Sequence, residues 1–373
     1  MINVEVKGIG FPNRGAELML VAIINQFKER GLNVNFVVEP MGDFKTRSKY
    51  PLFYKSRFSA RGWNFGIFFK ILPKVLRERY GIINTNEVDV VLDASGFAYG
   101  DKWGVSLLQH RFLKELNCYD GKPIVLLPQA FGPFESTKLR SGFSKLAANS
   151  NLLYCRDKQS AAYLHDLGVS NVINAPDFTN LVVTNDISVP NKLNNRIAVI
   201  PNFQMEKSNG NYVQVLASCI DYLRENGEEP FLLVHEGIRD YVLARRVSEH
   251  TKTPVDIIDP QDALVIKAII SKQKFIITSR FHGAVSALST GVIPFVMGWS
   301  HKYEELLADY EVTSLLCDVN KEELIKIMDS VINDASEFDR VRNSIQKMGC
   351  HQKERSKSMW DEVFAFLSPY LNE

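Results

Sequence analysis

The repeating unit of this protein is visible in one stretch, KFIITSRFHGAVSALSTGVIPFVM, which spans residues 274–297. An apolar run over 274–278 gives way to a helical pattern over 283–290, and a second apolar run follows over 292–297. Short apolar runs on either side of a helix are typical of buried parallel strands joined by a crossover. The stretch therefore predicts a strand, a helix and a second strand parallel to the first.

The same alternation continues through most of the chain. Further strands are predicted at 2–7, 33–38, 89–93, 123–127, 152–155, 172–175, 196–200, 231–235 and 255–258. In the helix expected over 16–30, apolar residues recur at the 3.6-residue period on one face. The pattern predicts an α/β protein with two doubly wound, Rossmann-like domains that face a cleft, each sheet being covered on both sides.

The composition excludes several classes of protein. The chain has 373 residues, and its 44 Lys and Arg against 43 Asp and Glu give no overall attraction to nucleic acid. The five cysteines are scattered, so neither a disulfide framework nor a zinc site is indicated, and a reducing cytoplasm fits them. The chain begins directly with a strand pattern, and no stretch approaches the roughly 20 apolar residues of a membrane span. We expect a cytoplasmic protein.

The domain boundaries follow from one break in the alternation. Residues 184–195 are polar, contain a proline and are predicted to be a linker. The N-terminal domain is then expected over 1–183 and the C-terminal domain over 196–350. A final helix from about Lys353, within 351–373, is expected to pack back across the boundary. The oligomeric state is not indicated by any feature of the sequence.

One segment departs from the overall neutrality. Residues 41–80 carry ten Lys and Arg against Asp43 and Glu78, interleaved with ten aromatic residues. One interpretation is a solvated basic loop and helix inserted after the second strand. The other is a patch that docks peripherally on the anionic inner face of the plasma membrane, since residues 66–76 place apolar side chains beside lysines. Single-stranded nucleic acid would use the same residue types, but no other feature supports it.

Polar groups follow the first strand. The glycine-rich segment 8–15 has neither the dinucleotide-binding spacing nor a P-loop. It opens a helix whose start brings Asn13, Gly15 and Glu17 to the carboxyl end of the strand, where they are candidates for binding an oxygen-rich acceptor. The alternative is a tight turn with Asn13 as the helix N-cap.

The third and fourth strands also end in short polar side chains. Asp93 and Ser95 follow one strand, and Gln129 follows the other. Such groups suit sugar hydroxyls at the edge where open sheets bind ligands. The alternative is structural, because an aspartate at a strand end commonly orders its own loop and a glutamine can brace a turn.

Four cationic or cationisable side chains stand where strands end and helices begin, namely Arg156, Arg280, His282 and Lys302. Arginine binds carboxylates and phosphates through two parallel hydrogen bonds, and histidine can donate a proton near neutral pH. Together with the first amides of the helix at Gly283, they predict a site for a substrate that carries both phosphate and carboxylate. The alternative is that His282 caps its helix and Arg280 pairs with an acid across the cleft.

These motifs resemble the polysaccharide pyruvyl transferase family over most of the chain. The resemblance is carried, in order, by Asn13-Arg14-Gly15-Ala16-Glu17-Leu18, Asp93-Ala94-Ser95-Gly96, Gln129-Ala130-Phe131-Gly132-Pro133-Phe134, Cys155-Arg156-Asp157, Ala175-Pro176-Asp177-Phe178, Ser279-Arg280-Phe281-His282-Gly283 and Lys302. It implies a fold similar to glycosyltransferase-B enzymes. It also implies transfer of the enolpyruvyl unit of phosphoenolpyruvate onto two hydroxyls of one sugar of a cell-surface polysaccharide or its lipid-linked precursor, leaving a ketal and free phosphate.

The resemblance also implies roles for the residues. Arg156, His282 and Lys302 would bind the donor, and Arg280 would contribute charge. We expect protonated His282 to deliver a proton to the methylene carbon of phosphoenolpyruvate, while Glu17, Asp93 and Asp177 remain candidates for the base that activates the first hydroxyl. No metal and no tightly bound cofactor are expected, phosphoenolpyruvate being a substrate.

Two other functions fit the same features. A nucleotide-sugar-dependent glycosyltransferase would use the cationic residues to bind a diphosphate, since fold alone does not determine function. A catalytically silent glycan-binding protein of the cell envelope is the third hypothesis.

Overall fold

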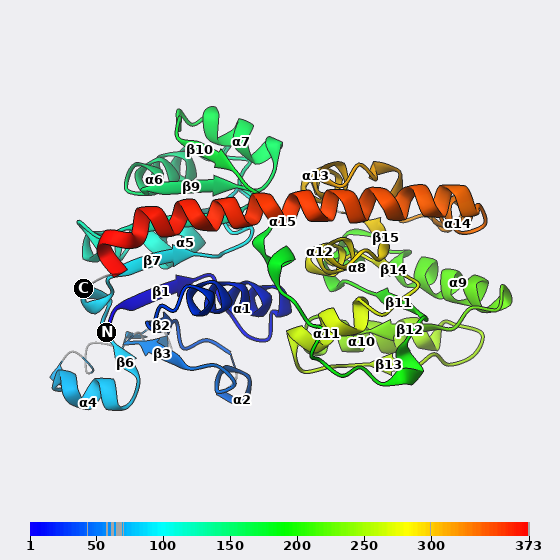
Figure 1. The fold of residues 1–373 in the computed structure, drawn as a ribbon, viewed down its shortest axis with the longest axis horizontal. Coiled ribbons are helices and arrows are strands. Elements are labelled where there is room, and N and C mark those ends of the chain that lie inside the picture. The colour runs from blue at the N-terminus through cyan, green and yellow to red at the C-terminus, as the bar shows by residue number, and fades with distance from the viewer. Residues whose placement is uncertain are drawn as a thin grey trace. The chain divides into compact units, whose positions relative to one another are not determined.

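Two compact units make up the chain, Met1–Phe178 with Ser356–Glu373, and Thr179–Arg355 (Figure 1). They are called here the first and second unit. The computed structural model describes residues 1–42, 44–56, 59–60, 63–64, 69, 71–298 and 300–371. All the strands expected from the sequence are present, with small shifts at their ends.

The first unit is built on a parallel sheet in the order β10-β9-β8-β7-β1-β2-β3-β6. Its strands are β1 (Asn3–Lys7), β2 (Asn35–Val38), β3 (Leu52–Lys55), β6 (Ile82–Ile83), β7 (Val90–Asp93), β8 (Ile124–Gln129), β9 (Leu152–Cys155) and β10 (Val172–Asn174). Its helices are α1 (Arg14–Glu29), α2 (Phe44–Arg47), α4 (Lys74–Arg79), α5 (Gly104–Leu108), α6 (Thr137–Ala148) and α7 (Lys158–His165). A separate antiparallel pair joins β4 (Ser59–Ala60) to β5 (Trp63–Asn64).

The second unit has a parallel sheet in the order β13-β12-β11-β14-β15-β16. Its strands are β11 (Ile197–Ile200), β12 (Pro230–Leu233), β13 (Ile257–Ile258), β14 (Phe275–Thr278), β15 (Ile293–Met297) and β16 (Leu316–Cys317). Its helices are α8 (Phe203–Ser208), α9 (Tyr212–Glu225), α10 (Gly237–Glu249), α11 (Ala263–Ile270), α12 (Phe281–Thr290), α13 (His301–Asp309) and α14 (Lys321–Ile332). The final helix α15 (Ala335–Leu371) begins in the second unit and ends in the first.

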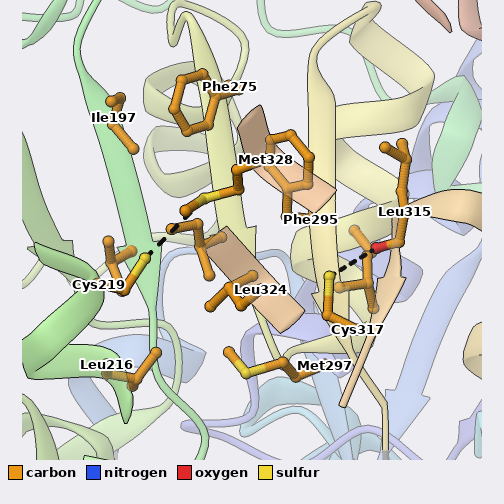
Figure 2. Close-up of a cluster of buried hydrophobic side chains, with 14 of the residues drawn as sticks. Ile197, Leu216, Cys219, Phe275, Phe295, Met297, Leu315, Cys317, Leu324 and Met328 are labelled. Carbon is orange, nitrogen blue, oxygen red and sulfur yellow. Dashed lines mark hydrogen bonds between the residues drawn. The ribbon is translucent and has the colours of Figure 1, made fainter. Parts of the chain in front are cut away.

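Burial of both faces of the sheet explains the continuous apolar strands. In β11, Ile197 and Val199 belong to one core cluster, whereas Ala198 and Ile200 belong to another. Figure 2 shows part of the first cluster, where Phe275 and Phe295 pack edge to face at 5.5 Å. Because alternate residues of one strand enter different clusters, the sheet is covered on both sides, as parallel sheets generally are.

Local signals in the sequence also set the helix ends. The Asn13 side chain accepts a hydrogen bond from Ala16 N at 3.1 Å and caps α1. The structure therefore shows the helix N-cap that was the alternative interpretation of Asn13. Asp157 caps α7 by accepting from Ser160 N at 2.6 Å, as its position after β9 predicts. The two caps place Glu17 and Arg156 at the carboxyl ends of β1 and β9.

The structure differs from the sequence-based expectation at several places, which include the unpredicted short strands β6 and β16. Residues 41–80 were expected to form a loop and a helix, but they also contain β3, which pairs in parallel with β2. The last helix starts at Ala335, well before the expected Lys353. Leu193, in the segment predicted to be a linker, is buried in a core cluster of the second unit. No helix within the described residues combines the length and the hydropathy that crossing a membrane requires.

Candidate active site

The carboxyl edge of the second sheet brings together four chain segments. Strands β12, β11, β14 and β15 are parallel neighbours, so their carboxyl ends lie at one edge. The residues that follow them include Glu236, Asn202, Arg280 and Lys302. In open α/β sheets this is the edge at which ligands bind.

Three buried polar side chains hold the start of α12. The Tyr212 hydroxyl donates to Ser279 Oγ at 2.8 Å, and the Asn202 side-chain amide donates to the Ser279 carbonyl at 2.7 Å. The Tyr303 hydroxyl donates to the same carbonyl at 2.9 Å. These partners come from three different segments and fix the backbone at Ser279, one residue before Arg280 and three before His282.

Gly283 has a packing reason to be glycine. A Cβ at this position would lie 2.8 Å from the Thr278 hydroxyl oxygen, which real Cβ atoms essentially never do. That oxygen also accepts a hydrogen bond from Arg280 N at 3.0 Å. The absence of a side chain therefore lets the first turn of α12 lie against the end of β14.

Arg280 forms ion pairs with Glu236 and Asp240, both in the same unit. Asp240 is fully buried, while its partner Glu236 is partly exposed. Burial raises the pKa of the Asp240 carboxyl, although Arg280 opposes that rise. Burial would lower the pKa of Arg280, but Asp240 and Glu236 outweigh it and hold this pKa above its ordinary value. The charge that the sequence assigned to donor binding is thus shared with two carboxylates of the protein.

His282 and Lys302 both contact the ring of Phe281. The His282 ring packs edge-on against Phe281, with centroids 5.5 Å apart, and Lys302 Nζ lies 5.3 Å from the centroid of the same ring. Lys302 is largely buried, whereas His282 is half-buried. An imidazole and an ammonium group therefore both contact the first residue of α12, and a helix N-terminus with such groups suits an anionic ligand.

Arg156 belongs to the first unit. It follows β9 and pairs with Asp177, the Nη1–Oδ2 distance being 3.0 Å, and both side chains are buried. Sequence reasoning treated Arg156 as a donor-binding residue and Asp177 as a base, without foreseeing that they contact each other. The pairing leaves each of them less charge to offer a substrate than an isolated group would have.

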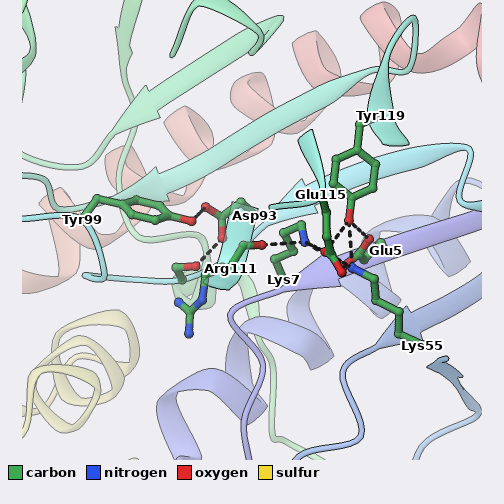
Figure 3. A network of polar contacts seen from close by, with 9 residues as sticks. Glu5, Lys7, Lys55, Asp93, Tyr99, Arg111, Glu115 and Tyr119 are labelled. Carbon is green, nitrogen blue, oxygen red and sulfur yellow. Dashed lines mark hydrogen bonds and ion pairs between the residues drawn. The ribbon is translucent and has the colours of Figure 1, made fainter. Parts of the chain in front are cut away.

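Asp93 and Gln129 contact each other at the carboxyl edge of the first sheet. The buried Asp93 carboxylate accepts a hydrogen bond from the Tyr99 hydroxyl at 2.7 Å (Figure 3). It also accepts from Gln129 Nε2 at 3.4 Å and from the Ser95 hydroxyl. Burial and Asp93 together raise the pKa of Tyr99 well above its ordinary value. These contacts match the structural alternative, in which Asp93 orders the loop that follows β7.

Glu17 is fully buried and has two partners. Arg14 Nη1 donates to its carboxylate at 2.7 Å and the Tyr50 hydroxyl donates at 2.8 Å. Gly15 is buried in the first turn of the same helix. The predicted acceptor-binding residues of the first unit are thus held in hydrogen bonds to neighbouring side chains.

Sequence reasoning missed a second polar cluster in the first unit. Glu5 and Lys7 of β1 meet Lys55 of β3, Glu115 and Tyr119 in a buried network (Figure 3). Lys55 Nζ lies 2.7 Å from Glu5 Oε1, and Lys7 Nζ lies 2.9 Å from it. Two charged residues, Glu5 and Lys7, at alternate positions of a central strand were the available signal, because such residues are buried only when paired.

The part of the chain that the structure describes contains no group of three or more His, Cys, Asp or Glu that could hold a metal ion.

The fold defines a class of protein, that of two Rossmann-like domains similar to the glycosyltransferase-B fold. A UDP complex of MnaA from S. aureus is similar, with a TM-score of 0.61 and 12% identity over 98% of this chain and 96% of that one. UDP-GlcNAc 2-epimerase from Neisseria meningitidis, bound to UDP-GlcNAc, is similar with a TM-score of 0.61 and 12% identity over 98% of this chain and 100% of that one. A glycosyltransferase from Rickettsia africae is similar with a TM-score of 0.60 and 11% identity over 100% of this chain and 99% of that one. At these identities the similarity is one of fold.

Within that class, the chain belongs to the polysaccharide pyruvyl transferase family, whose model matches residues 13–301. The match includes the segments that hold Asn13, Asp93, Gln129, Arg156 and His282. None of the curated proteins compared with the chain matches it.

Proposed function

We propose that this protein transfers pyruvate from phosphoenolpyruvate onto two hydroxyls of a sugar in a cell-surface polysaccharide or its lipid-linked precursor. Family membership supports a pyruvyl transferase acting on a saccharide. The observation that supports the choice of donor is that His282 and Lys302 both contact the Phe281 ring at the start of α12. A histidine and a largely buried ammonium group at a helix N-terminus suit a small acid that carries phosphate.

In this proposal the donor binds at the carboxyl edge of the second sheet. Lys302 and the amides at the start of α12 hold its anionic groups, and protonated His282 faces its methylene carbon. Lys302 is the stronger contributor, because a hydrogen bond to a charged group is worth about 1.5–3 kcal/mol against about 0.3–1 kcal/mol for a helix N-terminus. Arg156 remains a donor-binding candidate, and a raised KM in Arg156→Lys would support that role.

The reaction is an addition followed by an elimination. His282 gives a proton to the methylene carbon, which becomes a methyl group, and positive charge develops at the neighbouring carbon. A sugar hydroxyl attacks that carbon and loses its proton. The bond to the phosphate oxygen then breaks, the second hydroxyl attacks and loses its proton, and a ketal and inorganic phosphate are released.

We propose that either Glu17 or Asp177 is the base that accepts the proton of the first sugar hydroxyl. Asp93 uses its carboxylate to hold Ser95, Tyr99 and Gln129, so we assign it to loop structure. Glu17→Gln and Asp177→Asn separate the remaining two, because only the variant that lacks the base should lose turnover while still binding phosphoenolpyruvate.

The test is release of phosphate from phosphoenolpyruvate in the presence of envelope saccharides. His282→Gln should lower the rate by about 100- to 10,000-fold, the usual contribution of a general acid. His250→Gln is the matched control, because His250 is exposed at the far end of α10 and bonds to Arg246 O. Undiminished phosphate release by His282→Gln would remove the assignment.

The same assay separates the other two hypotheses. A glycosyltransferase would release nucleoside diphosphate from a sugar nucleotide and leave phosphoenolpyruvate untouched. A silent glycan-binding protein would bind saccharide in calorimetry and turn over neither donor.

We also propose that the protein contacts an anionic membrane peripherally through α4 and the residues beside it. Ile71 and Val75 are each 79% exposed, and Leu72 and Leu76 are 38% and 40% exposed. Arg77 turns inward to an ion pair with Glu87, whereas Lys74 is exposed beside the apolar residues. A helix that exposes apolar side chains next to a lysine fits a lipid interface. Residues 66–68 and Lys70 of the predicted patch lie outside the described residues.

A further inference from the structure

One buried carboxylate connects the three strand-end loops around the start of α12. Asp240 lies in the first turn of α10 and is fully buried. Its Oδ1 accepts a hydrogen bond at 3.2 Å from the backbone N of Phe203, the first residue of α8, at the end of the loop after β11. Its Oδ2 accepts from Glu236 N at 3.1 Å, in the loop after β12. Its third partner is the Arg280 guanidinium, in the loop after β14.

Glu236 also pairs with Arg280 but does not have the same position. Its carboxylate is 31% exposed and forms an ion pair with Arg280. Asp240, in contrast, bonds to the backbone of two loops and to the side chain of a third. The two acids therefore share a charge partner but differ in what they hold in place.

Arg280 is two residues from His282 and is the N-cap residue of α12. Its guanidinium forms ion pairs with the fully buried carboxylate of Asp240 and with the carboxylate of Glu236. A side chain held in this way orients the backbone that carries it. Removal of a buried charged partner leaves the other charge uncompensated, which is strongly destabilising locally.

We infer that Asp240 is a positioning residue, which acts through Arg280 and the two backbone amides to set the place of His282. Arg280 belongs with it as a positioning residue and does not bind the donor directly. This inference rests on the proposed function for its kinetic consequences, but the geometry that carries it does not depend on the substrate.

The first test compares Asp240→Asn with Glu236→Gln. An amide keeps the volume of Asp240 but turns an NH2 group toward one of its three donors, whichever way it is oriented. We expect the kcat for phosphate release from phosphoenolpyruvate to fall about 10- to 100-fold with KM within about threefold, as misplacement of a reacting group does. Glu236→Gln should change both constants by less than about threefold. Equal losses in the two variants would overturn the inference.

Arg280→Lys provides a second variant, which does not require Asp240→Asn to fold. Lysine keeps the positive charge but cannot bridge two carboxylates in the same way. If Arg280 positions His282, kcat falls and KM is retained. A raised KM with unchanged kcat would show that Arg280 binds the donor, contrary to the inference.

A substrate-free readout distinguishes this inference from the proposed function. The imidazole NMR resonances of His282, identified by their loss in His282→Gln, should move in Asp240→Asn and stay in place in Glu236→Gln. If the wild-type protein released no phosphate from phosphoenolpyruvate, the proposed function would fail and the NMR comparison would still decide the positioning role. Unmoved His282 resonances in a folded Asp240→Asn variant would refute it.

Discussion

The cationic residues of the site could be predicted from the sequence, but the acids that pair with Arg280 could not. His282 and Lys302 stand at the junction of an apolar run and a helical pattern, which is a local signal. The acids that neutralise Arg280 lie 44 and 40 residues away along the chain, and no local pattern joins them to it. Their contact exists only because β12 and β14 flank β11 in the sheet. The sequence could therefore predict that Arg280 is a cation at this edge of the sheet. It could not predict that carboxylates of the protein neutralise its charge.

Lys302 provides the prediction at this scale. Lys302→Met keeps the length of the side chain and removes the ammonium group. We expect the Kd for phosphoenolpyruvate to rise by about 10- to 100-fold, the loss of one charge-assisted hydrogen bond, as measured by calorimetry. Lys326→Met, at an exposed position of α14, is the control and should bind as the wild type does. Unchanged affinity in Lys302→Met would exclude Lys302 from the donor site.

Elements with a clear period were predicted, and those whose stability depends on distant partners were not. The strands and helices of both units follow apolar runs, caps and turns that the sequence displays. Strand β3 was missed because Leu52-Phe53-Tyr54-Lys55 ends in a charge within a basic, aromatic segment. Its place in the sheet is secured by Lys55, which is buried against Glu5 and the Tyr119 hydroxyl.

The buried network around Glu5 predicts a pH dependence of stability. Burial alone would raise the pKa of Glu5, but Lys7 and Lys55 outweigh it and lower this pKa from 4.5 to about 2. Because the pKa of Glu5 is lower in the folded state than its ordinary value, the ionised carboxylate stabilises the folded state at pH values above 4.5. This stabilisation is lost as the pH falls from 4.5 toward 2. Glu5→Gln should cost about 3–5 kcal/mol at neutral pH, because it leaves two lysines without this partner.

Urea unfolding at a series of pH values measures this effect. The difference in unfolding free energy between wild type and Glu5→Gln should shrink as the pH falls below 4.5. A difference that stays constant with pH would show that Glu5 contributes packing and not charge.

The exposed apolar side chains of α4 predict binding to anionic vesicles. Ile71→Ser with Val75→Ser should weaken binding to vesicles that contain phosphatidylserine, since it removes the two most exposed apolar side chains of this segment. Lys74→Glu should weaken it further at low salt. Sedimentation with vesicles is the measurement, and neutral vesicles are the control. Binding that survives both changes would leave α4 as a solvated surface.

At the scale of the whole molecule, composition and alternation predicted the α/β architecture. The two parallel sheets, the similarity to glycosyltransferase-B enzymes and the match to the pyruvyl transferase family agree with that prediction. Only side-chain chemistry distinguishes pyruvyl transfer from the nucleotide-sugar reactions that the same fold supports. The difference lies in a proton placed on carbon, which a glycosyl transfer does not require.

Transfer of pyruvate in D2O examines that proton. If protonated His282 delivers a solvent-derived proton to the methylene carbon, the methyl group of the sugar ketal carries one deuterium in NMR, and His282→Gln forms no labelled product. A ketal methyl group without solvent deuterium, or a wild-type protein that forms no ketal and releases nucleoside diphosphate from a sugar nucleotide, would contradict the mechanism.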